Sequence, residues 1–231
     1  MGGSKVGEKK RSYGQHCTVA RALDVVGERW TLLVVRELST GPKRFKDLLE
    51  GLPGIGTNLL AARLKMLEGE GIVRRAMLPP PAGSNVYELT GLGRSLEPVI
   101  VALSRWGARL LEAPREEEVL RAGWGVVAMR SVLGPEAADG RPGTYEFRID
   151  GEAFHLRVGD GGERLEARQG PAPDPDLVVI GDAETFLAVV SGRISPEEAV
   201  ESGALRIEGE REEDREALIA WLRHSIEPAA V

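Results

Sequence analysis

One face of the segment 58–68 carries side chains suited to reading base edges in duplex DNA. If the segment is helical, Asn58, Ala62 and Lys65 share this face and Ala61 lies at its edge. Asn pairs with adenine, Lys reaches guanine or a phosphate, and Ala touches a thymine methyl group. Three leucines fall together on the face that must be buried: Leu60, Leu64 and Leu67. A helix face that is merely exposed to solvent has a similar composition. Whether the face of 58–68 binds DNA must therefore be judged from the elements around it.

The neighbouring elements favour a winged helix-turn-helix. Apolar spacing predicts helices over 18–26, 29–38, 45–49 and 58–68, with glycine-rich or proline-rich turns between them. Thr57 is the expected N-cap of the last helix. Strands are expected over 72–78 and 85–89, joined by a hairpin tip at 79–84, and Thr90 begins a long helix to about Glu112. Helix, helix, turn, helix and hairpin is the order of a winged helix-turn-helix.

Basic residues flank the expected recognition helix. Three of them lie at the start of the preceding helix, beside the expected path of the phosphates, and two open the first wing strand. The wing tip itself has no Lys or Arg, which argues against a charge-based grip on the minor groove. The predicted DNA contacts are Lys43, Arg44, Lys46, Thr57, Asn58, Ala61, Ala62, Lys65, Arg74 and Arg75.

The charge divides the chain into unlike halves. Residues 1–112 carry 17 Lys and Arg against 11 Asp and Glu, whereas residues 113–231 carry 13 against 25. The overall net charge of −6 hides this asymmetry. It fits a basic half that faces nucleic acid and an acidic half with another task, although two ordinary domains can differ in the same way.

Enzymatic and metal-binding sites are not expected. The three histidines, His16, His155 and His224, stand in no triad and show no metal-ligand spacing. No phosphate-binding glycine loop is present, and a single cysteine allows no internal disulfide and no cysteine zinc site. No apolar stretch suits a signal peptide or a membrane span. We therefore expect a cytoplasmic protein without membrane insertion, catalytic residues, metal or cofactor.

Several separated motifs resemble the HxlR-type winged-helix regulators. They occur in the family's order at 16–33, 41–48, 60–67, 71–73, 87–90 and 93–96. The resemblance covers about 15–112 and implies a dimer that binds DNA sequence-specifically and regulates nearby genes. Two departures are the alanines on the recognition helix, where the family often has polar side chains, and the uncharged wing tip. These departures leave the operator sequence open.

The expected last helix of this half has an apolar seam. Its spacings of four, three, four, three and four are those of a heptad pattern, which Pro98 should kink or interrupt. The seam is formed by Leu92, Leu96, Val99, Leu103, Trp106 and Leu110. We expect it to be the homodimer contact, with packing against the second domain as the alternative.

The second half is expected to be α+β. A helix over about 116–133 precedes alternating strands at 145–149, 154–158 and 164–168, and strands at 177–180 and 204–207 flank capped helices. The segments 176–187, 192–200 and 202–209 resemble the sterol-carrier-protein-like fold. This resemblance covers about 120–225 and implies a mostly antiparallel five-stranded sheet, helices on one face and an apolar cavity.

The apolar side chains of this half have two interpretations. They could line a pocket for an apolar effector, or they could simply fill the core of a domain of this size. The set comprises Tyr145, Phe147, Phe154, Leu156, Val179, Phe186, Val190, Leu218 and Leu222.

Cys17 stands where some HxlR-type proteins carry a redox-responsive cysteine. From the residues alone a buried small hydrophobic side chain is the favoured interpretation, since Arg21 is the only nearby cation that could lower the pKa of the thiol. The alternative is a thiol-based redox sensor.

The sequence thus predicts a basic tail (1–14), a winged helix-turn-helix with its dimerisation helix (15–113) and a sterol-carrier-like domain (114–231). The favoured hypothesis is a homodimeric regulator of transcription that binds double-stranded DNA and responds to an apolar small molecule. The competing hypothesis is a lipid or small-molecule carrier that uses the winged helix only for dimerisation.

Overall fold

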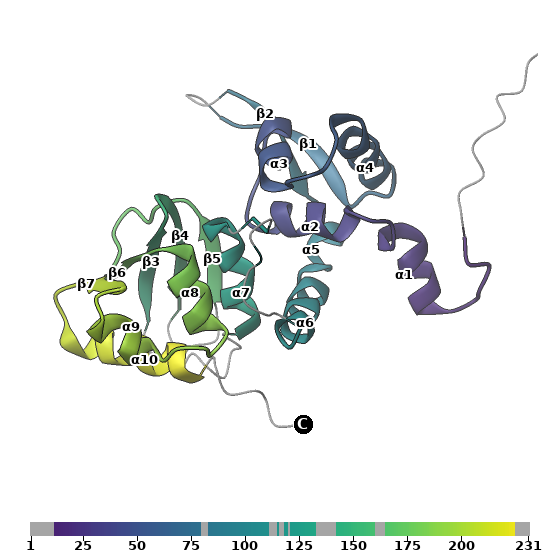
Figure 1. Ribbon diagram of the computed structural model, residues 1–231. Helices are drawn as coiled ribbons and strands as arrows, with labels where there is room; N and C mark the ends of the chain where they lie inside the picture. The colour runs from purple at the N-terminus through teal and green to yellow at the C-terminus, as the bar shows by residue number, and fades with distance from the viewer. Residues whose placement is uncertain are drawn as a thin grey trace, which may run out of the picture.

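The computed structural model describes residues 12–79, 83–110, 115, 118–119, 121–132, 142–159 and 165–224. A helical unit with a β-hairpin lies beside a unit built on a five-stranded sheet (Figure 1). The α+β class and the two-domain order predicted from the sequence are confirmed. Most of the predicted basic tail and the centre of the wing tip lie outside the described residues.

Four helices open the first unit: α1 (Thr18–Val26), α2 (Thr31–Ser39), α3 (Phe45–Gly51) and α4 (Thr57–Gly69). The helix expected at 29–38 begins two residues later, because Trp30 has a left-handed backbone with φ of 76°. The predicted cap of α4 is wrong, since Gly56 is the N-cap and Thr57 is the first helical residue.

The wing is the antiparallel pair β1 (Val73–Met77) and β2 (Asn85–Leu89), in which Val73 faces Leu89 and Met77 faces Asn85. Lys43 extends this sheet as an isolated bridge to Tyr87. Their backbones exchange two hydrogen bonds, of 3.0 Å from the Lys43 N–H and 2.8 Å from the Tyr87 N–H. The wing is thereby tied to the chain that leads into α3.

The long helix expected from Thr90 to Glu112 is two helices. The Thr90 hydroxyl accepts the Gly93 N–H at 3.1 Å and caps α5 (Gly91–Arg94), and α6 (Glu97–Ala108) follows with Pro98 in its first turn. Proline lacks the N–H that a continuous helix needs at this point, which explains the interruption. Gly93 is required because a Cβ there would collide with the Ile72 carbonyl oxygen.

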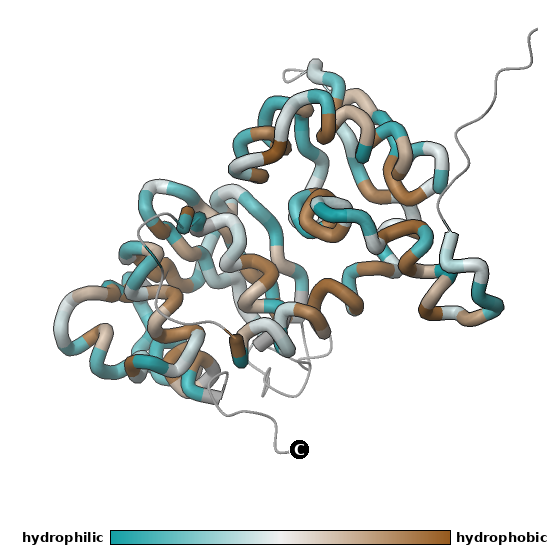
Figure 2. The backbone as a smooth tube through the Cα atoms, turned by 45° about the vertical axis from the view of Figure 1, so that its right-hand side comes forward, coloured by the Kyte–Doolittle hydropathy of each residue, from teal (hydrophilic) through white to brown (hydrophobic). Residues whose placement is uncertain are grey.

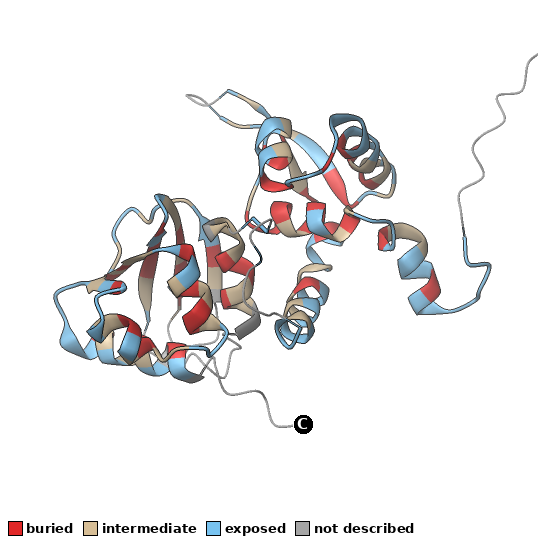
Figure 3. Ribbon diagram, in the orientation of Figure 1, coloured by how far each residue is buried: buried red, intermediate tan, exposed pale blue. Residues whose placement is uncertain are grey.

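The core of this first unit is aliphatic. Buried side chains of α2, α3, α4, β1 and α6 meet at its centre, and Figure 3 shows this buried interior in red. The members with almost no exposed surface are Val34, Val35, Leu48, Leu52, Leu60, Leu64 and Leu67. Apolar burial of this kind fixes the relative positions of the helices that carry the candidate site.

The second unit has the sheet order β5-β4-β3-β6-β7. Its strands are β3 (Gly143–Ile149), β4 (Glu152–Val158), β5 (Leu165–Gln169), β6 (Leu177–Gly181) and β7 (Leu205–Glu208). The β3–β6 pair is parallel, and the other three pairs are antiparallel. The five-stranded, mostly antiparallel sheet is confirmed.

The helices of the second unit are η1 (Ala122–Trp124), α7 (Gly125–Val132), α8 (Ala183–Val190), α9 (Pro196–Glu201) and α10 (Glu212–His224). The helix expected over about 116–133 is shorter than predicted, since the described residues 115, 118–119 and 121 are not helical. Its first turn is the 3-10 helix η1, and the α-helix α7 begins at Gly125. Asp182 caps α8 by accepting the Thr185 N–H, and Ser195 caps α9 by accepting the Glu198 N–H. The Thr185 N–H lowers the pKa of the capping Asp182 carboxyl.

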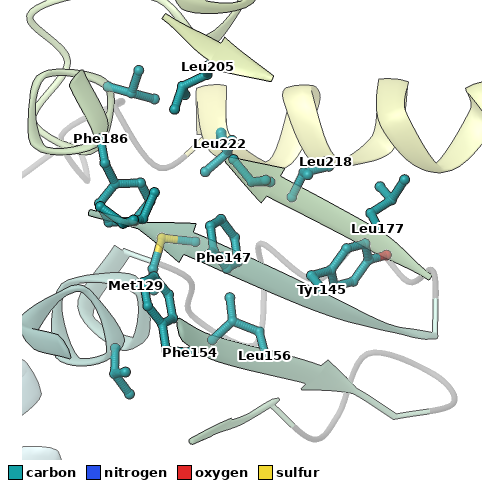
Figure 4. Close-up of a cluster of buried hydrophobic side chains, with 14 of the residues drawn as sticks. Met129, Tyr145, Phe147, Phe154, Leu156, Leu177, Phe186, Leu205, Leu218 and Leu222 are labelled. Atoms are coloured by element: carbon teal, nitrogen blue, oxygen red, sulfur yellow. The ribbon is translucent and has the colours of Figure 1, made fainter. Parts of the chain in front are cut away.

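The core of the second unit lies between the sheet and these helices (Figure 4). Phe147 and Phe154 stack with ring centroids 4.8 Å apart, and Phe186 meets both edge-on at 5.7 Å. Gly125 lies against this cluster, where a Cβ would stand 2.9 Å from the Phe186 ring. The alternation predicted for β3 and β4 is confirmed, since their apolar residues are buried against the helices.

Candidate DNA interface

The face of α4 predicted to meet DNA is exposed. Its residues Thr57, Asn58, Ala61, Ala62 and Lys65 are all exposed. The opposite face is fully buried through Leu60, Leu64 and Leu67. The burial of these leucines fixes the rotation of α4 about its axis, so the polar face and its two alanines point to solvent.

Leu59, which is not among the contacts predicted from the sequence, also lies on the solvent side of α4. The residue is 37 % exposed. Its spacing of three residues from Ala62 makes the two side chains neighbours on the helix surface, and this spacing is the signal that could have identified it. An exposed leucine at this position offers apolar contact to a thymine methyl group.

An ion pair outside the helix holds α4, and a capping bond stabilises the start of α3. The Arg63 guanidinium donates to the Glu28 carboxylate at 3.0 Å and so links α4 to the turn before α2. At the start of α3, the Arg44 N–H donates to the Asp47 carboxylate at 2.9 Å. The side chains of Arg44 and Lys46 are exposed, and Lys46 Nζ lies 3.4 Å from Glu50. Both cations are thus open to solvent beside the exposed face of α4.

Lys43 lies elsewhere than the sequence suggests. Its side chain is only 11 % exposed, and Nζ lies 3.7 Å from Glu37 Oε2. The ammonium also donates to Gln169 Oε1 of the second unit. Burial lowers the pKa of Lys43, while Glu37 opposes this change. The expected phosphate contact therefore does not describe Lys43 in this structure.

The two wing arginines are exposed but paired with carboxylates. Arg74 Nε donates to Glu88 at 2.7 Å, and Arg75 Nε donates to Glu68 at 2.9 Å. The Glu68 contact raises the pKa of Arg75, whose guanidinium also lies 5.5 Å from the ring centroid of Tyr87. These ion pairs reduce the positive potential that the wing presents to DNA.

The apolar seam is largely open to solvent although the second unit is present. The exposed members are Leu92, Val99, Leu103, Trp106 and Leu110, whereas Leu96 packs against the first core. The hydrophobic stretch 99–103 of α6 is brown in Figure 2. The alternative expectation was that the seam packs against the second domain. These five side chains do not, because they are exposed in its presence.

A second exposed apolar surface lies on α1, which projects away from the other helices (Figure 1). Val19 and Leu23 are exposed there, while Ala20 and Val26 are buried. This surface is not among the contacts predicted from the sequence. The i, i+4 spacing of Val19 and Leu23 was the signal that could have identified it.

Cys17 is exposed rather than buried, so the favoured expectation from the sequence was wrong. It is the N-cap residue of α1, whose first N–H groups point toward it. The Ala20 and Val19 N–H groups lower the pKa of the thiol, although neither reaches the sulfur in a full capping hydrogen bond. Arg21 lies instead 4.0 Å from Asp24.

The predicted pocket residues are packed together in the second core. Eight of them are buried, and Val190 packs against the cluster at its margin. Within the part of the chain that the structure describes, no group of His, Cys, Asp and Glu could hold a metal ion. Among the same residues, no helix combines the length and the hydropathy needed to cross a bilayer.

Comparison with known proteins agrees with this two-part architecture. The model of the HxlR-like helix-turn-helix family matches residues 25–115, and that of the SCP-2 sterol transfer family matches residues 131–214. The HTH-type transcriptional regulator sll1512 of Synechocystis is 37 % identical over 112 residues, which are 48 % of this chain and 83 % of the relative.

The HTH-type transcriptional regulator YodB of Bacillus subtilis is 38 % identical over 91 residues, which are 39 % of this chain and 81 % of YodB. The solved structure of its reduced form covers 44 % of this chain and 100 % of that one, with 35 % identity and a TM-score of 0.37. The chain therefore belongs to the HxlR family of helix-turn-helix transcriptional regulators and joins its HxlR domain to an SCP-2 domain.

Proposed function

We propose that this protein binds operator DNA as a homodimer, with α4 in the major groove, and so regulates transcription. The observation that carries the proposal is the exposed face of α4. Asn58 and Lys65 are exposed on this face together with two alanines that allow close approach. Because its leucine face is buried in the core, α4 can present only this side to DNA. Arg44 and Lys46 would then contact phosphates beside it.

The dimer would form through the exposed apolar side chains of α6, joined by those of α1. Trp106 is 62 % exposed, and large apolar side chains that line up on a surface mark interaction sites. A two-fold axis through this surface pairs each residue with its copy. Two recognition helices related in this way bind a palindromic sequence whose half-sites are one helical turn, or a multiple of it, apart.

The second domain would adjust DNA binding by accepting an apolar small molecule. Support comes from the SCP-2 family match and from the aromatic cluster of Phe147, Phe154 and Phe186. Since these rings are packed against each other, a ligand must displace at least one of them, and binding would change the domain's shape. A molecule that prefers the changed shape shifts the dimer between DNA-competent and incompetent states. If the purified protein binds no apolar molecule, this part of the proposal is wrong.

Lys65→Ala tests the DNA interface. The variant should bind its operator about tenfold more weakly, and the slope of log K against log salt should become shallower by about one, because one cation is lost. Arg157→Ala is the matched control, since Arg157 is exposed on the second domain. Salt titrations of operator affinity by fluorescence anisotropy compare the three proteins.

The carrier hypothesis makes the opposite prediction. If the winged helix serves only for dimerisation, Lys65→Ala and Asn58→Ala leave every DNA measurement unchanged. A shallower slope in Arg157→Ala as well would show that charge in general, rather than α4, controls binding.

A thiol sensor is the second candidate function, favoured by the exposure of Cys17 and by the lowered pKa of its thiol. The thiolate is the reactive form, and a helix N-terminus stabilises it. With one cysteine in the sequence, oxidation would produce a disulfide between two subunits or with a small thiol.

The lowered pKa of Cys17 should be visible in its alkylation rate. Because less alkali is needed to form the thiolate, the rate of reaction with iodoacetamide should reach half its maximum below the pH of about 8.5 typical of a free cysteine. Mass spectrometry of reactions quenched at set times, from pH 5 to 10, measures this midpoint. A midpoint at or above 8.5 contradicts the expectation. For a sensor, Cys17→Ser should abolish the response of DNA binding to oxidant and leave resting binding intact.

A further inference from the structure

Helix α7 belongs to both cores. Val127 packs with the buried residues of the first unit, whereas Val126 and Met129 pack with those of the second. Figure 1 shows α7 between the sheet and helices α2 and α6. Arg130 on the same helix donates to the Ser39 carbonyl at 3.2 Å and to the Ala167 carbonyl at 2.7 Å. The two units are therefore joined by shared packing as well as by the chain.

A polar cluster lies at this junction and centres on Glu37 of α2, which is buried together with Lys43. The Glu37 side chain is 8 % exposed and lies 3.7 Å from Lys43. Its Oε1 accepts the Trp124 indole N–H at 3.0 Å and the Arg36 guanidinium at 2.8 Å. The Arg36 guanidinium stands over the Trp124 ring, 4.5 Å from its centroid. The second domain contributes two residues to the cluster: Trp124 of η1, and Gln169 of β5, which accepts a hydrogen bond from the Lys43 ammonium.

The same cluster touches both ends of α3. Lys43 directly precedes the N-cap Arg44, and its backbone is hydrogen-bonded to Tyr87 of the wing. Gly51, the last residue of α3, lies against the Glu37 carboxylate, where a Cβ would collide with Oε2. The Glu37–Lys43 pair therefore lies against both ends of α3, and the backbone of Lys43 is bonded to the wing.

Resting on the proposed DNA-binding function, we propose that Lys43 is a positioning residue that does not touch DNA. The Glu37–Lys43 pair, held by Trp124 and Gln169, transmits the position of the second domain to α3 and the wing. A buried ammonium that loses its partners carries a large desolvation cost, so the pair follows Gln169 and Trp124 when the second domain moves. This gives the second domain a direct mechanical connection to the DNA-reading elements.

Lys43→Met tests the role, because methionine keeps the unbranched stem and removes the charge. Loosening α3 and the wing should weaken operator affinity about tenfold, within the range typical of coupling between sites. The salt slope should stay that of the wild type, because no phosphate contact is lost. Lys46→Met is the matched control at an exposed lysine three residues away and should reduce the slope by about one.

Gln169→Leu probes the same connection from the second domain and does not alter the winged helix itself. It should weaken operator binding at an unchanged slope, and Lys43→Met combined with Gln169→Leu should weaken it less than the two single effects together. Thermal unfolding monitored by circular dichroism provides a measurement without DNA. In each single variant, the difference between the melting temperatures of the two domains should be larger than in the wild type.

Three results would overturn the proposal. One is a salt slope reduced by about one in Lys43→Met, which would make Lys43 a phosphate contact. Another is wild-type or tighter operator affinity in both single variants, and the third is full additivity in the double variant. If instead the wild-type protein binds no DNA, the proposed function fails, while the unfolding measurement still tests the connection between the domains.

Discussion

Leu103→Glu is expected to convert the proposed dimer into a monomer and to lower affinity for a two-half-site operator by about 100-fold or more. Leu103 lies in the exposed apolar line of α6 and is 44 % exposed in the single chain. In a two-fold dimer the substitution places two like charges in an apolar contact, and an uncompensated buried charge costs about 3–5 kcal/mol. Sedimentation velocity and gel-shift assays on one-half-site and two-half-site duplexes measure the two effects.

Val119→Glu is a suitable control, because Val119 is also about half exposed but lies outside this line. It should remain dimeric and bind normally. Since Leu103 is partly exposed in the single chain, Leu103→Glu should keep its circular dichroism spectrum. A Leu103→Glu protein that stays dimeric and binds the operator like the wild type would show that the dimer forms elsewhere.

Phe186→Ala should destabilise the second domain by about 3–5 kcal/mol, the usual cost of emptying a buried aromatic site. Phe186 is buried and stands edge-on to both Phe147 and Phe154, so its loss leaves a gap between α8 and the sheet. Chemical denaturation followed by circular dichroism measures the change. Leu187→Ala, a half-buried neighbour on the same helix, should cost less.

The same variant tests the proposed apolar site. A fluorescent fatty acid should bind the wild-type protein and should bind Phe186→Ala more tightly, because the ring no longer has to be displaced. At a free concentration 100 times Kd, the ligand should add about 2.7 kcal/mol to the free energy of unfolding. If neither protein binds the fatty acid or gains stability from it, the second domain is not an apolar-ligand site of this kind.

Local patterns were sufficient to predict most elements of the fold. The leucine spacing of α4 and the alternation of β3 and β4 correctly predict which apolar side chains are buried. Glu146 of β3 is an exception to the alternation, because it is also buried and accepts the Ala172 N–H. Pro98 correctly marked the interruption before α6. The left-handed Trp30 could not be predicted, since a left-handed backbone is unusual for a large side chain.

The misplaced site residues depend on contacts that are distant in sequence. Lys43 is basic and near a recognition helix, so its sequence alone suggests a phosphate contact. In the structure its ammonium instead donates to Gln169, which lies 126 residues further along the chain. Cys17 is exposed because α1 buries only Ala20 and Val26, and the apolar content of the helix does not reveal how little of it faces the core.

The most direct measurement is the selection of bound fragments from a random duplex library, followed by a salt titration on the selected sequence. We expect a shared, roughly palindromic sequence with half-sites about 34–36 Å apart or a multiple of this distance, and affinity that falls steeply with salt. The selection should be carried out under reducing and oxidising conditions, each with and without the fatty acid. No enriched sequence under any of the four conditions would contradict a role in DNA binding.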